Sequence, residues 1–239
     1  YALGAHSFVP PFKGKDLPEV VSIRSIADAE QVNRLAERAK TAVVIGGGVL
    51  GLEAAWELHK IGLQVTVLEA APVLMAGKID QETAKMLIDI GAKKGISIRT
   101  GVQIAEISGT DHVDGVLLAD GTKAPADLVI VSTGVRANIE LAEAAGVKTD
   151  RAVIVDAQMQ TSVQDIYAAG DCAAFAGKNI ALWPVAAEMG RIAGANAAGE
   201  ALTYIPEDCG LNFHGMDTAL FAIGDVGADA DKHYKVVEI

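Results

Sequence analysis

Apolar residues recur along this 239-residue chain with two periods, and the change between them marks the predicted elements. Spacings of three to four residues at 28–40 and 183–199 predict helices with one buried side. Residues 43–45 form a continuous apolar run, which is typical of a strand buried on both faces of a parallel sheet. Between 96 and 133 the period approaches two, which predicts antiparallel strands. The pattern therefore favours an α/β fold with an antiparallel β insert.

Shorter segments complete the predicted order of elements. Asp80 is expected to cap a helix that turns Ala84, Leu87 and Ile88 inward. A linker at 206–212 is followed by two predicted strands, at 220–223 and 234–239. The other predicted elements are the end of a strand at 2–5, strands at 65–69, 102–108, 116–118, 128–131, 153–156 and 166–169, and a short helix at 138–145.

A glycine-rich turn directly follows the first apolar run. It reads Gly-Gly-Gly-Val-Leu-Gly and begins at Gly46, which permits the tight turn. Gly48 would let the main chain approach phosphate oxygens, and Gly51 would let the next helix pack closely on the strand. The N–H groups at the start of that helix, which includes Val49 and Leu50, lie at the positive end of its dipole and attract a diphosphate. The turn therefore predicts a site for a dinucleotide.

The helix after this turn has an apolar pattern of its own. Leu50, Ala54 and Leu58 recur at four-residue spacing and are expected to face the sheet. Gly62 is expected to end the helix. Strand, glycine turn and helix in this order separate a nucleotide-binding unit from an ordinary glycine turn.

A carboxylate closes the second strand of this unit. Glu69 follows Gly46 by close to the roughly 20 residues that precede a ribose-binding acid in such units. A carboxylate there accepts hydrogen bonds from a free 2′-hydroxyl and repels a 2′-phosphate. Ala70 and Ala71 come next, so no arginine adjoins Glu69 to bind such a phosphate. We therefore expect NADH rather than NADPH.

Composition narrows the class of protein further. A formal net charge of −11 argues against general binding to nucleic acid or anionic membranes, and apolar runs stop well short of the roughly 20 residues of a membrane helix. Cys172 and Cys209 are too few and too far apart for a disulfide framework or a zinc site, so no metal is expected. No signal-peptide pattern opens the chain at Tyr1, which is not a native start, and cytoplasm is the default expectation.

A second nucleotide motif lies far downstream, at Thr161-Ser-Val-Gln-Asp-Ile-Tyr-Ala-Ala-Gly-Asp-Cys172. With both motifs, the chain resembles the FAD-dependent pyridine nucleotide-disulfide oxidoreductases, in particular the branch of NADH oxidases, rubredoxin or ferredoxin reductases and the flavin part of nitrite reductases. Ala2-Leu-Gly-Ala5 resembles the end of the family's first FAD segment, and residues 131–138 resemble the second such turn. The resemblance covers about residues 1–200 in the family's order.

The resemblance implies a three-layer Rossmann-like FAD/NAD(P)-binding fold in which an NAD domain is inserted into a partial FAD domain. Residues 1–20 would end the first FAD segment, and 21–136 would form the NAD-binding domain. Residues 137–203 would form the second FAD segment, and 204–239 the linker and the start of a C-terminal interface domain. The first FAD fingerprint of the family is missing, so FAD binding by this piece alone is in doubt.

The resemblance also implies roles for single residues. Glu53 stands where the family places a glutamate beside the flavin and nicotinamide; an exposed helix glutamate is the alternative. Gly134 would let the chain pass near the nicotinamide, and a plain turn glycine is the alternative. Asp171 would bond the ribityl chain of FAD. The FAD-binding positions implied in this way are Gly4, Gly170, Asp171, Ala187 and Glu188.

Three functions compete at this point. The leading one is an oxidoreductase that passes hydride from NADH to FAD, with electrons going on to oxygen, a small redox protein or another acceptor. The full-length protein would then be compatible with a homodimer. The second is a non-catalytic NAD(H)-binding regulatory module. The third is a dehydrogenase without flavin, which would need a proton-shuttling side chain near the nicotinamide; His59, His112 and His233 lie in unrelated helix, turn and tail contexts.

Overall fold

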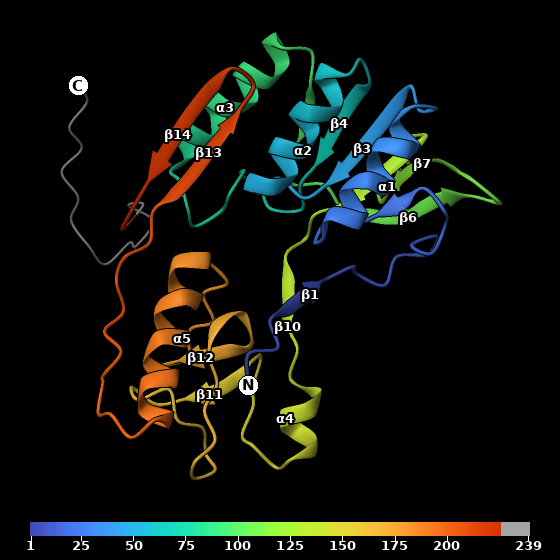
Figure 1. Ribbon diagram of the computed structural model, residues 1–239. Coiled ribbons are helices and arrows are strands. Elements are labelled where there is room, and N and C mark those ends of the chain that lie inside the picture. The colour runs from blue at the N-terminus through green and yellow to red at the C-terminus, as the bar shows by residue number, and fades with distance from the viewer. Residues whose placement is uncertain (226–239) are drawn as a thin grey trace. The chain divides into compact units, whose positions relative to one another are not determined.

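The chain forms two units in the computed structural model, and each is described by itself (Figure 1). The larger unit contains Val9–Thr133 and the chain from Gly210 onward, and the smaller unit contains Tyr1–Phe8 and Gly134–Cys209. Residues 1–225 are described. The strand predicted at 234–239 lies outside them.

A five-stranded parallel sheet forms the centre of the larger unit. Its order is β2-β9-β3-β4-β5, and β3 lies between β4 and β9 with Val43 opposite Thr66 and Val129. The central strands are nearly all Val, Ile, Leu and Ala because both faces are covered. The strands are β2 (Val20–Val21), β3 (Thr41–Ile45), β4 (Gln64–Leu68), β5 (Ser97–Arg99) and β9 (Leu128–Val131).

Alternate residues of β3 enter two different cores. Ala42 and Val44 pack with helices α1 (Ile26–Ala36), α2 (Val49–Lys60) and α3 (Gln81–Lys93). Val43 and Ile45 pack with an antiparallel meander on the opposite face. The meander consists of β6 (Ile104–Gly109), β7 (Val113–Leu118) and β8 (Lys123–Pro125). The predicted three-layer α/β fold with an antiparallel insert is therefore confirmed.

Two of the predicted helices differ from the structure in detail. Helix α1 begins two residues earlier than predicted because Ser25 caps it reciprocally with Asp28, and it ends at Ala36 rather than at 40. The predicted inner side of α2 was right for Leu58 and for Ala54, which packs partly buried against the core, but wrong for Leu50. Leu52, Ala55 and Leu58 are buried, whereas Leu50 is 68% exposed.

Other local predictions are confirmed. Asp80 accepts a hydrogen bond from the Thr83 N–H at 2.8 Å as the N-cap of α3. Ala84 and Leu87 of that helix are buried. Gly62 follows the end of α2 with φ +97°, a left-handed conformation that favours glycine.

A β-hairpin near the end of the described chain belongs to the larger unit. It consists of β13 (Leu211–Gly215) and β14 (Thr218–Ala222), and it lies beside α2 and α3 (Figure 1). Phe213 and Met216 are almost fully buried in the helix-side core. The predicted linker at 206–212 therefore runs into a strand, because Leu211 and Asn212 pair with β14.

The smaller unit packs two short strand pairs against a helix. β1 (Ala5–Ser7) is antiparallel to β10 (Val135–Ala137), and β11 (Val153–Val155) is parallel to β12 (Ala173–Phe175). Helix α4 (Glu140–Ala144) and helix α5 (Trp183–Ala197) complete it, and Val185, Met189 and Ile192 of α5 are buried in its core.

Two predicted strand segments of this unit were wrong. Residues 166–169 form no strand, because Tyr167 makes only an isolated bridge to Gln160. The main chain of this segment instead bonds to Tyr1, through the Ala169 N–H at 3.0 Å and the terminal amine at 2.6 Å. The strand placed at 2–5 begins only at Ala5, because Gly4 has φ +64°.

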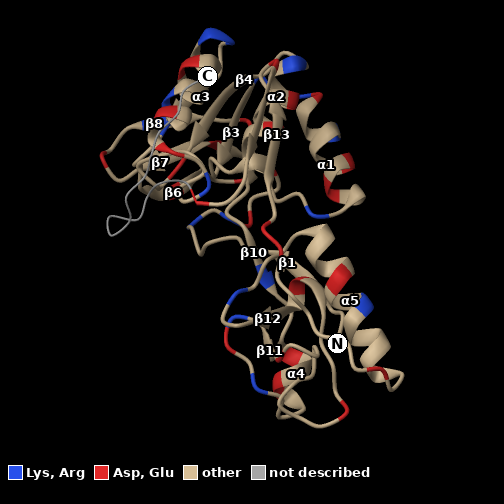
Figure 2. Cartoon of the chain, turned by 90° about the vertical axis from the view of Figure 1, so that its left-hand side faces the viewer, with Lys and Arg blue, Asp and Glu red and all other residues tan. Residues whose placement is uncertain are grey.

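The acidic excess is spread over the sequence. Acidic and basic positions are interspersed along the chain (Figure 2), and the formal net charge is −11. Within residues 1–225, no helix is long and apolar enough to cross a membrane.

Candidate dinucleotide site

Two glycines of the turn after β3 cannot be replaced without a clash. Gly46 has φ +115°, and a Cβ there would lie 2.2 Å from the Ser132 carbonyl oxygen. A Cβ at Gly51 would lie 2.1 Å from the Gly46 carbonyl oxygen. Both contacts are with main chain, so side-chain movement cannot relieve them. The predicted tight turn and close helix–strand packing are therefore present.

Gly48, unlike Gly46 and Gly51, has room for a side chain. It is the N-cap of α2 with φ −78°, and a Cβ there would meet nothing within 4 Å. No side chain caps this helix end, and its first turn holds no acidic residue. The helical bonds begin with the Leu52 N–H donating to the Gly48 carbonyl at 3.0 Å. The N–H groups of Val49, Leu50 and Gly51 thus precede the helical bonding pattern, and the helix start at Gly48 borders open space, which is the arrangement of an anion site.

Glu69 is joined directly to this glycine turn. Its Oε2 accepts a hydrogen bond from the Gly47 N–H at 2.6 Å, and its Oε1 accepts one from the Ala71 N–H at 2.7 Å. The side chain is partly buried, and the residue directly follows β4. The structure therefore brings together the turn and the carboxylate that the sequence predicted from spacing alone.

The loop after β4 adds contacts that the sequence analysis missed. The Met75 N–H donates to the Gly47 carbonyl at 3.3 Å, and Leu74 is fully buried. A Cβ at Gly47 would lie 2.5 Å from Leu74 Cδ2. Met75 has φ +47°, an uncommon conformation for a side chain of this size. Gly47 is therefore a structural position in its own right, and only its place among three glycines could have signalled it.

Glu53 lies on α2, beyond the glycine turn. Its Oε1 accepts a hydrogen bond from the main-chain N–H of His214 at 3.2 Å. His214 is part of β13, and sequence analysis did not connect the hairpin with the nucleotide site. The donor is a main-chain group of a strand distant in sequence, so no motif could have revealed it.

The predicted flavin-side residues lie in the smaller unit. Gly4 and Gly134, which was predicted to lie near the nicotinamide, have φ +64° and +93°, so each occupies a turn that favours glycine. Gly170, with φ +77°, begins the short 3₁₀ turn Gly170–Cys172, and a Cβ there would lie 3.5 Å from Ala186 Cβ. The turn that carries Asp171 therefore packs against the first turns of α5.

Around Asp171 and α5 the contacts are mainly local. The Asn179 side chain donates to the Asp171 carbonyl at 3.0 Å. Ala187 is exposed, and Glu188 pairs with Arg191 at 2.7 Å, which lowers the pKa of the Glu188 carboxyl. The Ala186 N–H already donates to the Leu182 carbonyl at 2.9 Å. The main-chain donors that precede the helical bonding pattern are therefore those of Trp183 and Val185.

Two of the histidines considered for a flavin-free dehydrogenase lie apart, and the third, His233, is outside the described residues. His59 of α2 stacks on Trp56 with ring centroids 5.7 Å apart. His112 lies between β6 and β7, on the opposite face of the sheet, and pairs with Glu19 at 2.6 Å. Among the described residues, no group of His, Cys, Asp and Glu could hold a metal ion.

The strand, glycine turn, helix and closing carboxylate define a dinucleotide-binding protein of the Rossmann class. Residues 1–190 match the family described as "Pyridine nucleotide-disulphide oxidoreductase". The chain belongs to this family, which confirms the family predicted from the motifs.

The chain is similar in sequence and in structure to known oxidoreductases. The chain is 38% identical over 172 residues to "Nitrite reductase [NAD(P)H]" of Bacillus subtilis, covering 72% of this chain and 21% of that protein. It is 36% identical to "NADH oxidase" of Methanocaldococcus jannaschii, covering 94% and 50%. A solved ferredoxin reductase from Rhodopseudomonas palustris superposes with a TM-score of 0.87 at 34% identity, covering 95% and 57%. The chain thus spans half or less of these two curated relatives.

Proposed function

We propose that this chain is the NADH-binding part of an FAD-dependent oxidoreductase in which NADH delivers hydride to the flavin. The observation that carries the proposal is the hydrogen bond between the Gly47 N–H and Glu69. It joins the carboxylate expected to bind a ribose to the glycine turn expected to bind a diphosphate. Similarity to proteins named for NADH oxidation and for nitrite reduction with NAD(P)H supports the reaction class.

In this proposal the larger unit holds the nucleotide. The open space at Gly48 admits the diphosphate, which the first-turn N–H groups of α2 bind together with the helix dipole. Each Glu69 oxygen accepts one hydrogen bond from a main-chain N–H and keeps a further lone pair. With these lone pairs Glu69 binds the adenosine ribose. Its negative charge disfavours a 2′-phosphate, so NADH is preferred.

The flavin side rests on the smaller unit. Asp171 would bond the ribityl chain, and the glycines Gly4 and Gly170 would let main chain lie close to FAD. The start of α5, leading to Ala187 and Glu188, would turn its positive end toward the flavin ring. Hydride acceptance and onward electron transfer are the chemistry that FAD would supply when these residues hold it. Glu53 would align the nicotinamide, because hydride transfer depends on positioning.

The electron acceptor belongs to the same proposal. The similarity to a ferredoxin reductase supports a small redox protein as the acceptor, with oxygen as the main alternative. Which of the two accepts the electrons can be measured by supplying each in turn to the full-length protein with NADH.

Two measurements test the proposal. Calorimetric titration of this chain should show binding of NADH that is stronger than binding of NADPH. Anaerobic mixing of the full-length, flavin-loaded protein with NADH should bleach the flavin absorbance. A protein that binds NADH without bleaching would instead be a regulatory module, and a chain that binds no NADH would remove both functions.

A further inference from the structure

The β13–β14 hairpin has a free main-chain edge that faces Glu53. Met216 and Asp217 form its two-residue turn with φ +54° and +53°, as in a type I′ turn. The pair next to such a turn, Gly215 and Thr218, exchanges hydrogen bonds, so the following pair of His214 and Ala219 does not. The N–H of His214 therefore points away from β14.

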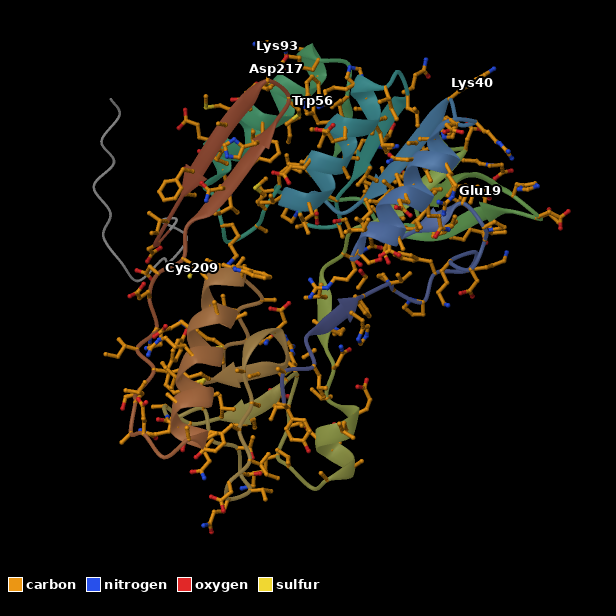
Figure 3. The ribbon with its side chains drawn as sticks, viewed as in Figure 1. Glu19, Lys40, Trp56, Lys93, Cys209 and Asp217 are labelled. Atoms are coloured by element: carbon orange, nitrogen blue, oxygen red, sulfur yellow. The ribbon has the colours of Figure 1, made fainter. Side chains whose placement is uncertain are left out.

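Three contacts fix the hairpin on the larger unit. Phe213 and Met216 are almost fully buried, and a Cβ at Gly91 of α3 would lie 3.3 Å from Met216 Sδ. Lys94 Nζ pairs with Asp217 Oδ2 at 2.5 Å, beyond the end of α3. Figure 3 labels Trp56 on α2 and Asp217 at the hairpin tip. The hairpin is therefore anchored at its tip and along β13, and the His214 N–H that points away from β14 has a defined position.

We propose that this hairpin is a positioning element that holds the carboxylate of Glu53 through the main-chain N–H of His214. The bond joins the His214 N–H to Oε1 at 3.2 Å, and within residues 1–225 no hydrogen bond to Oε2 is found. A glutamate side chain has several rotatable bonds, and a carboxylate that is already oriented loses less freedom when a nucleotide binds. The consequence for NADH rests on the proposed function.

The structure supplies a matched set of variants. His214→Pro removes the donor without removing a bond of the hairpin ladder, since proline is tolerated at strand edges. Ala219→Pro places the same backbone constraint on the residue directly opposite, which does not bond to Glu53. His214→Ala keeps the donor, and the side chain that it removes is exposed. All three would be made in the full chain and checked for folding by circular dichroism.

The bond itself is tested by the amide NMR signal of His214. It should shift in Glu53→Ala and remain close to its original position in Glu53→Gln, whose side-chain oxygen still accepts. The amide of Ala219 should move in neither variant. An unchanged His214 signal in Glu53→Ala would overturn the proposal, whether or not the chain binds NADH.

The consequence is tested by NADH titration in a double-mutant cycle. His214→Pro should weaken NADH binding by roughly three- to tenfold, the effect of one hydrogen bond. Ala219→Pro and His214→Ala should leave it unchanged. In a Glu53→Ala background His214→Pro should have no further effect. An equal effect in both backgrounds would mean that the hairpin does not act through Glu53 and would overturn the positioning role. Absence of NADH binding by the unaltered chain would count against the proposed function instead.

Discussion

Glu69 Oε2 accepts a hydrogen bond from the main-chain N–H of Gly47 at 2.6 Å, so the carboxylate at the end of β4 is fixed to the turn after β3. The second oxygen accepts from the Ala71 N–H at 2.7 Å. These bonds give the carboxylate one orientation before any nucleotide arrives. They also mean that Glu69 supports the glycine turn as well as the sugar that we propose it binds.

Replacing Glu69 should therefore affect two properties. Glu69→Ala leaves the N–H groups of Gly47 and Ala71 without their acceptor, and hydrogen bonds to charged groups contribute about 1.5–3 kcal/mol. NADH affinity should fall at least tenfold, and the preference over NADPH should shrink. Calorimetric titration with both nucleotides measures this. Glu69→Gln keeps one acceptor oxygen and should retain more of the stability than of the preference. An unchanged preference in both variants would contradict the ribose role.

The glycine turn offers a second, paired test. Gly48→Ala should fold normally, with a cost of about 1 kcal/mol or less, because its Cβ points into open space at φ −78° and only the weaker N-cap preference of alanine opposes it. NADH binding should nevertheless fall tenfold or more, since the methyl group enters the space proposed for the diphosphate. Gly51→Ala should lose about 1–3 kcal/mol of unfolding free energy or more, because its Cβ would lie 2.1 Å from the Gly46 carbonyl.

Thermal unfolding and NADH titration of both variants separate the two roles. A Gly48→Ala protein that binds NADH like the original would place the diphosphate elsewhere. A Gly51→Ala protein of unchanged stability would show that α2 can move away from the turn.

The sequence predicted what depends on short-range pattern. The turn from Gly46 to Gly51 and the carboxylate of Glu69 were predictable because glycine placement and spacing follow from the geometry of one strand–turn–helix unit. The rotation of α2 about its own axis was not predictable. Gly51 must face the Gly46 carbonyl, and this contact rotates the helix so that Leu52 is buried and Leu50 is exposed.

Of the hairpin, only part of β14 was predicted, as the strand at 220–223; the turn and β13 could not be predicted, for a different reason. The turn at Met216 and Asp217 lacks the Asn-Gly or Asp-Gly sequence that marks a type I′ turn. Its association with α2 and α3 depends on contacts between residues far apart in sequence, such as Lys94 with Asp217. The bond from His214 to Glu53 follows only from that association.

The pair of Glu19 and His112 should make stability depend on pH. The hydrogen bond that His112 donates to the Glu19 carboxylate raises the pKa of His112 from 6.5, and nearby Asp111 adds to this. Burial alone would raise the pKa of Glu19, but its bonds to His112 and the Val113 N–H outweigh burial and lower the pKa below 4.5. The pair contributes fully only when both groups are charged. Its contribution is lost as the pH rises through the raised pKa of His112 and as it falls through the lowered pKa of Glu19.

The difference in urea midpoint between the original chain and His112→Gln should therefore be largest between pH 4.5 and 6.5. It should shrink well above pH 6.5, where His112 is neutral in both states. Because His112 is exposed, the difference should also fall when salt is added. A difference that stays constant across this pH range would show that the ion pair does not contribute.

The two phenylalanines of the hairpin test whether it is part of the larger unit in solution. Phe213 of β13 is fully buried in the helix-side core, whereas Phe221 of β14 is 61% exposed. Phe213→Ala should lower the unfolding free energy by about 3–5 kcal/mol, because it removes a buried aromatic ring and leaves a cavity. Phe221→Ala, which removes the same ring from the outer side, should change it by no more than about 0.5 kcal/mol. Chemical denaturation of the two variants gives the comparison. Similar small losses in both would mean that the hairpin is not packed on α2 and α3, and the position of the His214 N–H beside Glu53 would then have no structural support.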